Sequence, residues 1–133
     1  MKPLLRNIIA LPAGIIAGGL LNSGIVFIGN AIFPTGIDPN DYEAYAQVIP
    51  TLSMEYFIFP FLAHALGTLF GAYIASKVAV SYQLLWSLLI GGFFLVGGIT
   101  AISMFGGPTW FMILDLTIAY IPMAYLGYKF ASK

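Results

Sequence analysis

Four long apolar runs dominate the sequence and constrain the fold more than any other feature. They cover approximately residues 8–33, 54–76, 82–105 and 108–128. Each run reaches or exceeds the roughly 20 residues that an α-helix needs to cross a hydrocarbon core of about 30 Å. The runs are continuously apolar, whereas the strands of a membrane barrel alternate in hydropathy over about 10 residues. The sequence therefore predicts an all-α integral membrane protein, with residues 1–133 forming a single domain of four transmembrane helices.

The composition argues against a water-soluble domain, because 60% of the residues are hydrophobic and 8% are charged. So few polar side chains cannot cover a water-facing surface. The formal net charge is zero, so no basic field attracts nucleic acid. The chain has no Cys and one His, which removes disulfides, Cys-based zinc sites and multi-His metal sites within one chain. We expect the lipid bilayer as a partner, and we expect no nucleic acid, no cofactor and no bound metal.

The charged residues at the ends of the apolar runs or outside them are sorted by sign. With four spans, the basic residues all lie on one side: Lys2, Arg6, Lys77, Lys129 and Lys133. The acidic residues lie on the other side: Asp38, Asp41, Glu43 and Glu55. Cytoplasmic loops of membrane proteins carry an excess of Lys and Arg. The pattern therefore predicts a multi-pass protein of the bacterial inner (plasma) membrane with the N- and C-termini in the cytoplasm.

The first external connection, residues 34–53, is long for a helical bundle, in which connections usually have about 2–8 residues. Within it, Asp38 followed by Pro39 is typical of an N-cap and a first helical position. Pro50 would end such a helix. We therefore expect a short helix over residues 39–48, lying at the membrane surface.

Small residues recur at helical spacing in three of the runs and predict the faces on which the helices meet. The rows are Ala10, Gly14 and Gly18, continued by Asn22; then Gly67, Gly71 and Ala75; then Ser87, Gly91 and Gly98. This pattern indicates glycine-mediated helix packing. Pro60 and Pro122 lie inside the second and fourth runs, and we expect each to bend its helix.

Asp115 is the one charged residue that lies deep inside an apolar run, since Glu55 lies at the mouth of the second run. It lies about seven residues from the outer end of the fourth run, roughly 10 Å deep at about 1.5 Å per residue. His64 and Asn22 lie at a similar depth in the second and first runs. We therefore expect these three side chains to converge in the outer half of the bundle. Thr68, Thr100 and Tyr120 could join them from slightly deeper levels.

Such a group has two interpretations, which the sequence leaves open. A coupled carboxyl and imidazole can bind a proton, a cation or a small polar solute, and ionisable groups inside a membrane usually mark functional sites. The alternative is interhelical hydrogen bonding without function.

The leading functional hypothesis is binding or transport of a small solute, proton or cation at an intramembrane polar site. The alternative is a non-catalytic accessory or scaffold subunit of a larger membrane complex. An enzyme is not expected, because the chain has no Cys nucleophile, phosphate-binding loop or metal-ligand cluster. We expect a homo-oligomer, because four short helices hardly enclose a solute path and their Gly-rich faces can pack against a second copy.

Two segments carry a resemblance to other proteins. They are Phe57-Ile58-Phe59-Pro60-Phe61-Leu62-Ala63-His64-Ala65-Leu66-Gly67-Thr68 and Trp110-Phe111-Met112-Ile113-Leu114-Asp115-Leu116. Both resemble segments of a group of uncharacterised bacterial four-span inner-membrane proteins, and this resemblance implies no activity. In size and span count the chain also resembles the small multidrug resistance transporters, but only in architecture. The membrane-embedded Glu of that family has no counterpart here, because Gly14, Gly18 and Asn22 line the corresponding face.

Overall fold

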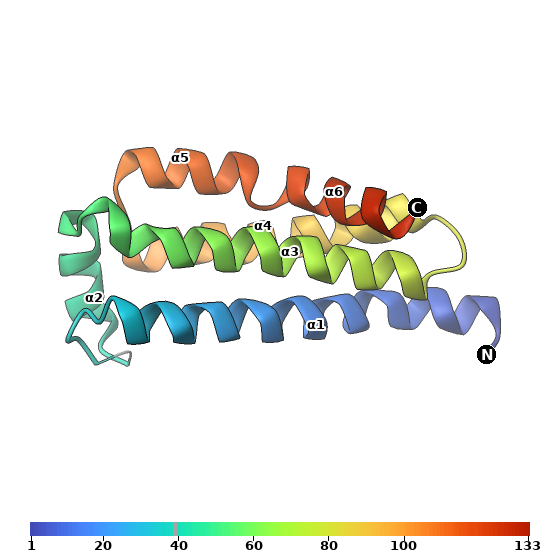
Figure 1. Cartoon of the computed structure of the whole chain (residues 1–133), viewed down its shortest axis with the longest axis horizontal. Helices are drawn as coiled ribbons and strands as arrows, with labels where there is room; N and C mark the ends of the chain where they lie inside the picture. The colour runs from blue at the N-terminus through green and yellow to red at the C-terminus, as the bar shows by residue number, and fades with distance from the viewer. Residues whose placement is uncertain (39) are drawn as a thin grey trace.

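The structure, a computed structural model, describes residues 1–38 and 40–133. Throughout that part, the regular elements are all helical. In chain order they are α1 (Pro3–Ile32), α2 (Tyr42–Val48), the 3₁₀ turns η1 (Ile49–Thr51) and η2 (Met54–Phe57), α3 (Ile58–Val78), α4 (Gln83–Phe105), α5 (Thr109–Ile118) and α6 (Ile121–Ala131). In Figure 1, α3 lies between α1 and the α5–α6 pair, with α4 behind it. Both termini lie at one end of the bundle, and α2 lies at the other.

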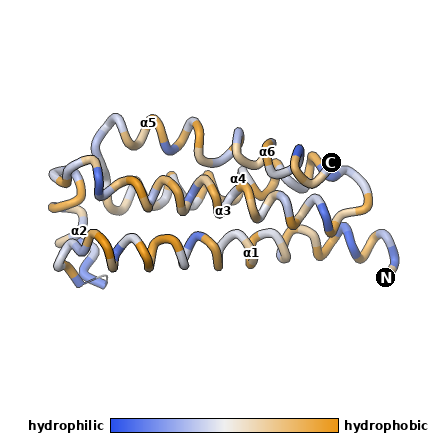
Figure 2. Tube along the Cα trace, viewed as in Figure 1, coloured by the Kyte–Doolittle hydropathy of each residue, from blue (hydrophilic) through white to orange (hydrophobic). Residues whose placement is uncertain are grey.

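Within the described residues, four helical segments are long and apolar enough to cross a membrane. They are Pro3–Ile32, Met54–Val78, Gln83–Phe105 and Thr109–Ala131, with mean hydropathies between 1.4 and 2.1. Figure 2 shows hydrophobic residues along these segments and hydrophilic residues concentrated towards the two ends. The prediction of a helical chain with four spans able to cross a membrane is therefore confirmed.

Helices α1 and α3 approach each other closely at facing glycines. A Cβ atom on Gly14 would lie 2.6 Å from the carbonyl oxygen of Gly71, and one on Gly18 would lie 2.5 Å from that of Gly67. Separations below 3.0 Å essentially never occur for real Cβ atoms. The backbones therefore meet at a distance that a side chain at Gly14 or Gly18 would not allow.

The end of the bundle that holds both termini is fixed by hydrogen bonds from α1 to the turn between α3 and α4. The Arg6 Nε atom donates to the carbonyl oxygen of Val78 over 3.0 Å. The Asn7 side chain accepts from the backbone N–H of Val80 over 2.9 Å and donates to the Ser81 hydroxyl over 2.6 Å. A guanidinium at the C-terminus of α3 also complements the partial negative charge of that helix end.

The two prolines expected to bend helices act differently in the structure. Pro60 is the third residue of α3, directly after η2, so it lies in the first helical turn, where its missing N–H costs little. Near Pro122 the fourth span is interrupted, because α5 ends at Ile118 and α6 begins at Ile121. Proline cannot donate the hydrogen bond that the Ile118 carbonyl would receive in a continuous helix. The fourth predicted span is present as the apolar segment Thr109–Ala131, and its helix is interrupted at the place where a bend was expected.

The short helix in the connection between the first and second spans begins later than predicted. It starts at Tyr42, and Asp41 is its N-cap, with a carboxylate oxygen that accepts from the backbone N–H of Ala44 over 3.0 Å. The prediction that Asp38 caps this helix is therefore wrong, and Pro39 lies outside the described residues. The rings of Tyr42 and Tyr45 pack on Phe105 with centroid separations of 5.6 and 6.1 Å. These contacts hold α2 against the end of α4.

Candidate functional site

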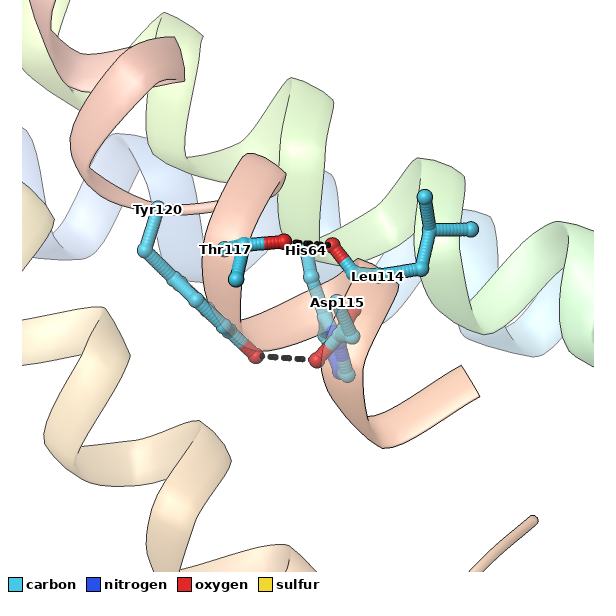
Figure 3. Close-up of polar contacts among 5 residues, drawn as sticks. All are labelled: His64, Leu114, Asp115, Thr117 and Tyr120. Carbon is cyan, nitrogen blue, oxygen red and sulfur yellow. Dashed lines mark hydrogen bonds and ion pairs between the residues drawn. The ribbon is translucent and has the colours of Figure 1, made fainter. Parts of the chain in front are cut away.

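Asp115 is the centre of a buried polar cluster formed by α3, α5 and the break between α5 and α6. The Nδ1 atom of His64 lies 2.9 Å from Oδ1 and 3.0 Å from Oδ2 of Asp115. The Tyr120 hydroxyl donates to Oδ2 over 2.9 Å (Figure 3). Asp115 and Tyr120 are 1% and 2% exposed, whereas the His64 side chain is 26% exposed. His64 is therefore the member of this cluster with the greatest access to its surroundings.

The fold holds each of these side chains in place. His64 lies on α3, the helix that packs against α1, α4 and α6, and its ring stacks on the Tyr120 ring at a centroid separation of 5.7 Å. Tyr120 lies at the break that precedes Pro122. Asp115 is one of the two buried residues of α5. The carboxylate thus faces the middle of the bundle.

The cluster can hold a proton in more than one position. When Asp115 is ionised it only accepts hydrogen bonds, so Nδ1 of His64 must carry the proton of their shared bond. The other ring nitrogen, Nε2, is then free to accept a hydrogen bond or a second proton. The ionised carboxylate would therefore accept hydrogen bonds from both Nδ1 of His64 and the Tyr120 hydroxyl.

An outer cavity of about 270 Å³ reaches this cluster from the end of the bundle that carries α2. His64 and Asp115 form part of its lining. Aromatic side chains from several elements form much of the remaining wall: Phe33, Tyr45, Tyr56, Phe59, Phe105 and Phe111. This combination of an apolar wall and a few convergent polar groups is typical of small-molecule sites.

An inner cavity of about 190 Å³ lies beside the same cluster. Its polar lining residues are Asn22, His64, Thr68 and Tyr120. Three residues line both cavities: His64, Gly98 and Ala101. His64 therefore lies where the two cavities adjoin.

The structure brings together some of the residues that the sequence singled out. Asp115, His64 and Tyr120 form one hydrogen-bonded cluster. Asn22 and Thr68 line the inner cavity near His64, and no hydrogen bond within the described chain links either to Asp115. Thr100 does not join them, because its side chain is exposed and its hydroxyl donates to the carbonyl oxygen of Val96.

Sequence reasoning missed the aromatic wall of the outer cavity and the role of Ala101. The wall residues come from the C-cap of α1 and from α2, η2, α3, α4 and α5, so no spacing in the sequence links them. Gly98 did carry a signal, since it belongs to the row of small residues in the third run. Its contact with the Tyr120 ring explains why a small residue lies there.

Together, the fold and the site define a small helical protein with four segments able to cross a membrane and a buried carboxyl–imidazole pair next to two cavities. Comparisons of the chain with protein-family models, curated proteins and solved structures found no match. Any function must therefore be argued from the site itself.

Proposed function

We propose that this protein binds a small solute, a proton or a cation at the Asp115–His64–Tyr120 cluster and carries it across the membrane. The observation that carries this proposal is the outer cavity of about 270 Å³, whose lining includes both Asp115 and His64. Closely packed surroundings on every side of the pair would instead favour a purely structural role. A carboxylate that is 1% exposed and still borders a cavity is available to a bound molecule.

The charges around the outer cavity favour a cation or a hydrogen-bond donor as the bound species. Among its described lining residues there is one carboxylate, Asp115, and there is no Lys or Arg. With His64 neutral, the ionised carboxylate gives the site one negative charge, which a membrane interior tolerates only with a partner. Protonation of His64 supplies that partner from within the protein. A proton and a cationic solute therefore compete for the same carboxylate.

Native mass spectrometry of the protein extracted from its own membrane in mild detergent tests the binding site. We expect a small molecule bound to the wild-type chain and to Thr117→Val, because the Thr117 hydroxyl bonds to the Ile113 carbonyl and lies outside the cluster. Asp115→Asn, which keeps the side-chain size but removes the charge, should lose it. Retention of the same mass by Asp115→Asn would contradict the role given to the carboxylate.

Proton binding is measured separately in proteoliposomes that contain a trapped pH-sensitive dye. An imposed potassium gradient with valinomycin should drive proton entry in the wild-type protein and in Thr117→Val. Asp115→Asn should reduce the rate at least about a hundredfold, the lower end of the typical contribution of a positioned proton-transfer group. Equal rates in all three proteins would exclude proton transport through this site.

The proposed orientation places both termini in the cytoplasm of a bacterium and α2 at the outer surface of its inner membrane. It is supported by the five basic residues at one end and by the positive-inside rule. Since the chain has no Cys, single-cysteine variants test it without background. An impermeant maleimide added to intact spheroplasts should label Glu43→Cys and should not label Ser132→Cys. The opposite pattern would reverse the orientation.

A second candidate function, an accessory subunit or one copy of a homo-oligomer, has its own supporting observation. A Cβ atom added to Gly19 or Gly24 of α1, or to Gly92 or Gly97 of α4, meets nothing within 4 Å. In lipid, small residues of this kind let helices of neighbouring chains approach closely. Gly92→Leu should then release the partner chain in mild detergent, as measured by mass photometry. An unchanged mass would contradict this candidate.

A further inference from the structure

The hydroxyl of Thr68, in the lining of the inner cavity, is buried and has no hydrogen-bond partner. Thr68 is 1% exposed, and within the described chain its Oγ1 atom lacks any partner. A buried hydroxyl left without a hydrogen bond destabilises the folded protein. An unsatisfied polar group of this kind therefore requires an explanation.

Three other hydroxyl side chains in the spans form a hydrogen bond within their own helix. Thr100, Ser103 and Thr117 each donate to the carbonyl oxygen four residues earlier, over 2.8, 2.9 and 2.6 Å. This back-bonding is the usual way to satisfy a Thr inside a helix. Thr68 departs from it, so its hydroxyl is left available to the cavity that it lines.

A second uncharged polar group borders the same space from α1. Asn22 lines the inner cavity, and its Cβ atom lies 3.0 Å from the position of a Cβ atom on Gly67. The absence of a side chain at Gly67 therefore gives Asn22 its place beside α3. A carboxamide both donates and accepts hydrogen bonds, as does a hydroxyl. His64, one turn before Thr68 on α3, adds a ring nitrogen to the lining.

We infer that the inner cavity is a second binding compartment, which takes small uncharged molecules able to donate and accept hydrogen bonds. Water, a small alcohol and a primary amide share this chemistry. The volume of about 190 Å³ has room for several water molecules, each of which occupies about 30 Å³ in the liquid. Molecules reach the compartment from the outer cavity between His64 and Ala101, which line both. This inference goes beyond the proposed function, because it needs no solute at Asp115.

The reactivity of a cysteine at position 68 tests the compartment. Thr68→Cys in nanodiscs is treated with methyl methanethiosulfonate, and Leu66→Cys, which replaces a side chain 40% exposed on the outside of the bundle, is the matched control. The reactive form of Cys is the thiolate, which forms in contact with water and not in lipid. We expect Thr68→Cys to react at least about tenfold faster than Leu66→Cys, as a hydrated thiol should. Equal rates would overturn the inference.

A competition arm identifies the molecule that occupies the compartment. Acetamide has one donor group and one acceptor oxygen, which match the Asn22 and Thr68 side chains. Slower modification of Thr68→Cys in acetamide, with no change at the outer-cavity variant Asn30→Cys, assigns the compartment to small polar solutes. Unchanged modification of both assigns it to water.

The proposed route from the outer to the inner cavity is tested with a larger side chain at Ala101, which lines both cavities. Ala101→Leu leaves Asp115, His64 and Tyr120 intact and fills the space beside His64. We expect it to slow modification of Thr68→Cys and to leave Asn30→Cys unchanged, whereas equal rates with and without Ala101→Leu would exclude this route. These experiments do not involve binding at Asp115, so their failure would leave the proposed function standing. Failure of the proposed function would likewise leave these results unaffected.

Discussion

The hydroxyl of Tyr120 donates a hydrogen bond to Oδ2 of Asp115 over 2.9 Å, and the two residues are five positions apart in the chain. On a continuous α-helix, residues five apart point about 140° away from each other, at 3.6 residues per turn. The two groups meet because α5 ends at Ile118 and α6 begins only at Ile121. The helix break before Pro122 is therefore part of the site.

Replacement of Pro122 tests this dependence. Pro122→Ala restores an N–H that can bond to the Ile118 carbonyl, so we expect α5 and α6 to join and Tyr120 to turn away from Asp115. In the wild-type chain, Tyr120→Phe should lower the free energy of unfolding by about 0.6–1.7 kcal/mol, the range for interhelical hydrogen bonds in membranes. In the Pro122→Ala background, Tyr120→Phe should leave the free energy of unfolding unchanged. Equal costs in both backgrounds, measured by equilibrium unfolding in detergent, would show that the break does not create the bond.

Two substitutions of Asp115 separate its structural role from its proposed binding role. Asp115→Leu leaves the Tyr120 hydroxyl and Nδ1 of His64 without a partner, so the free energy of unfolding should fall by about 1–3 kcal/mol. Asp115→Asn keeps an acceptor oxygen for Tyr120 and should cost much less, while ligand binding is lost. Thermal unfolding in detergent and native mass spectrometry measure the two properties. If Asp115→Asn binds ligand as the wild type does, the carboxylate has a structural role alone.

Adjacent glycines on α1 give opposite predictions. A Cβ atom on Gly18 would collide with the carbonyl oxygen of Gly67, so Gly18→Ala should destabilise the fold by about 1–3 kcal/mol through overpacking. A Cβ atom on Gly19 meets nothing within 4 Å. Gly19→Ala should therefore be neutral, or stabilising by up to about 1 kcal/mol from helix propensity. Thermal unfolding of both variants decides the matter, and similar melting temperatures would contradict the close approach of α1 and α3.

The observed cap of α2 predicts a local effect. Asp41→Ala removes the acceptor of the Ala44 N–H and should cost this short helix about 1 kcal/mol. Asp38→Ala is the matched control, since the Asp38 carboxylate accepts from the Asn40 N–H and does not cap α2. We expect faster amide hydrogen exchange over Tyr42–Val48 in Asp41→Ala alone. An equal increase in Asp38→Ala would mean that the helix begins nearer the predicted position.

The sequence predicted the parts of this protein that depend on local properties. Hydropathy and length identified the four spans, and the similar depths of His64 and Asp115 predicted that they would meet, which they do. The bond from Tyr120 was not predictable in the same way, because it depends on Pro122 ending a helix and not bending it. Membrane helices often tolerate proline by small adjustments, so the sequence alone does not distinguish the two outcomes.

Asn22 and Thr68 show a different limit of sequence reasoning. Depth and helix face placed both near His64, and both lie there. Whether they bond to Asp115 or line a separate space depends on how far apart α1 and α4 lie where both pack against α3. That separation results from contacts among several helices, such as the approach of Gly18 to Gly67 and the packing of Gly98 on Tyr120. No single run of residues encodes it.

The attachment of α5 has a thermodynamic consequence. Its two buried residues are Phe111, whose ring packs on Phe57 at a centroid separation of 4.8 Å, and Asp115. Helix α5 ends at the break, so the hydrogen bonds of Asp115 are one of its two buried anchors to the bundle. A molecule that binds in the outer cavity and replaces the hydrogen bond of Asp115 to His64 or Tyr120 would weaken the attachment of α5 to the bundle. Binding in the outer cavity and displacement of α5 would then be linked. If displacement of α5 changes the affinity for the molecule by a given factor, binding of the molecule changes the equilibrium constant for that displacement by the same factor.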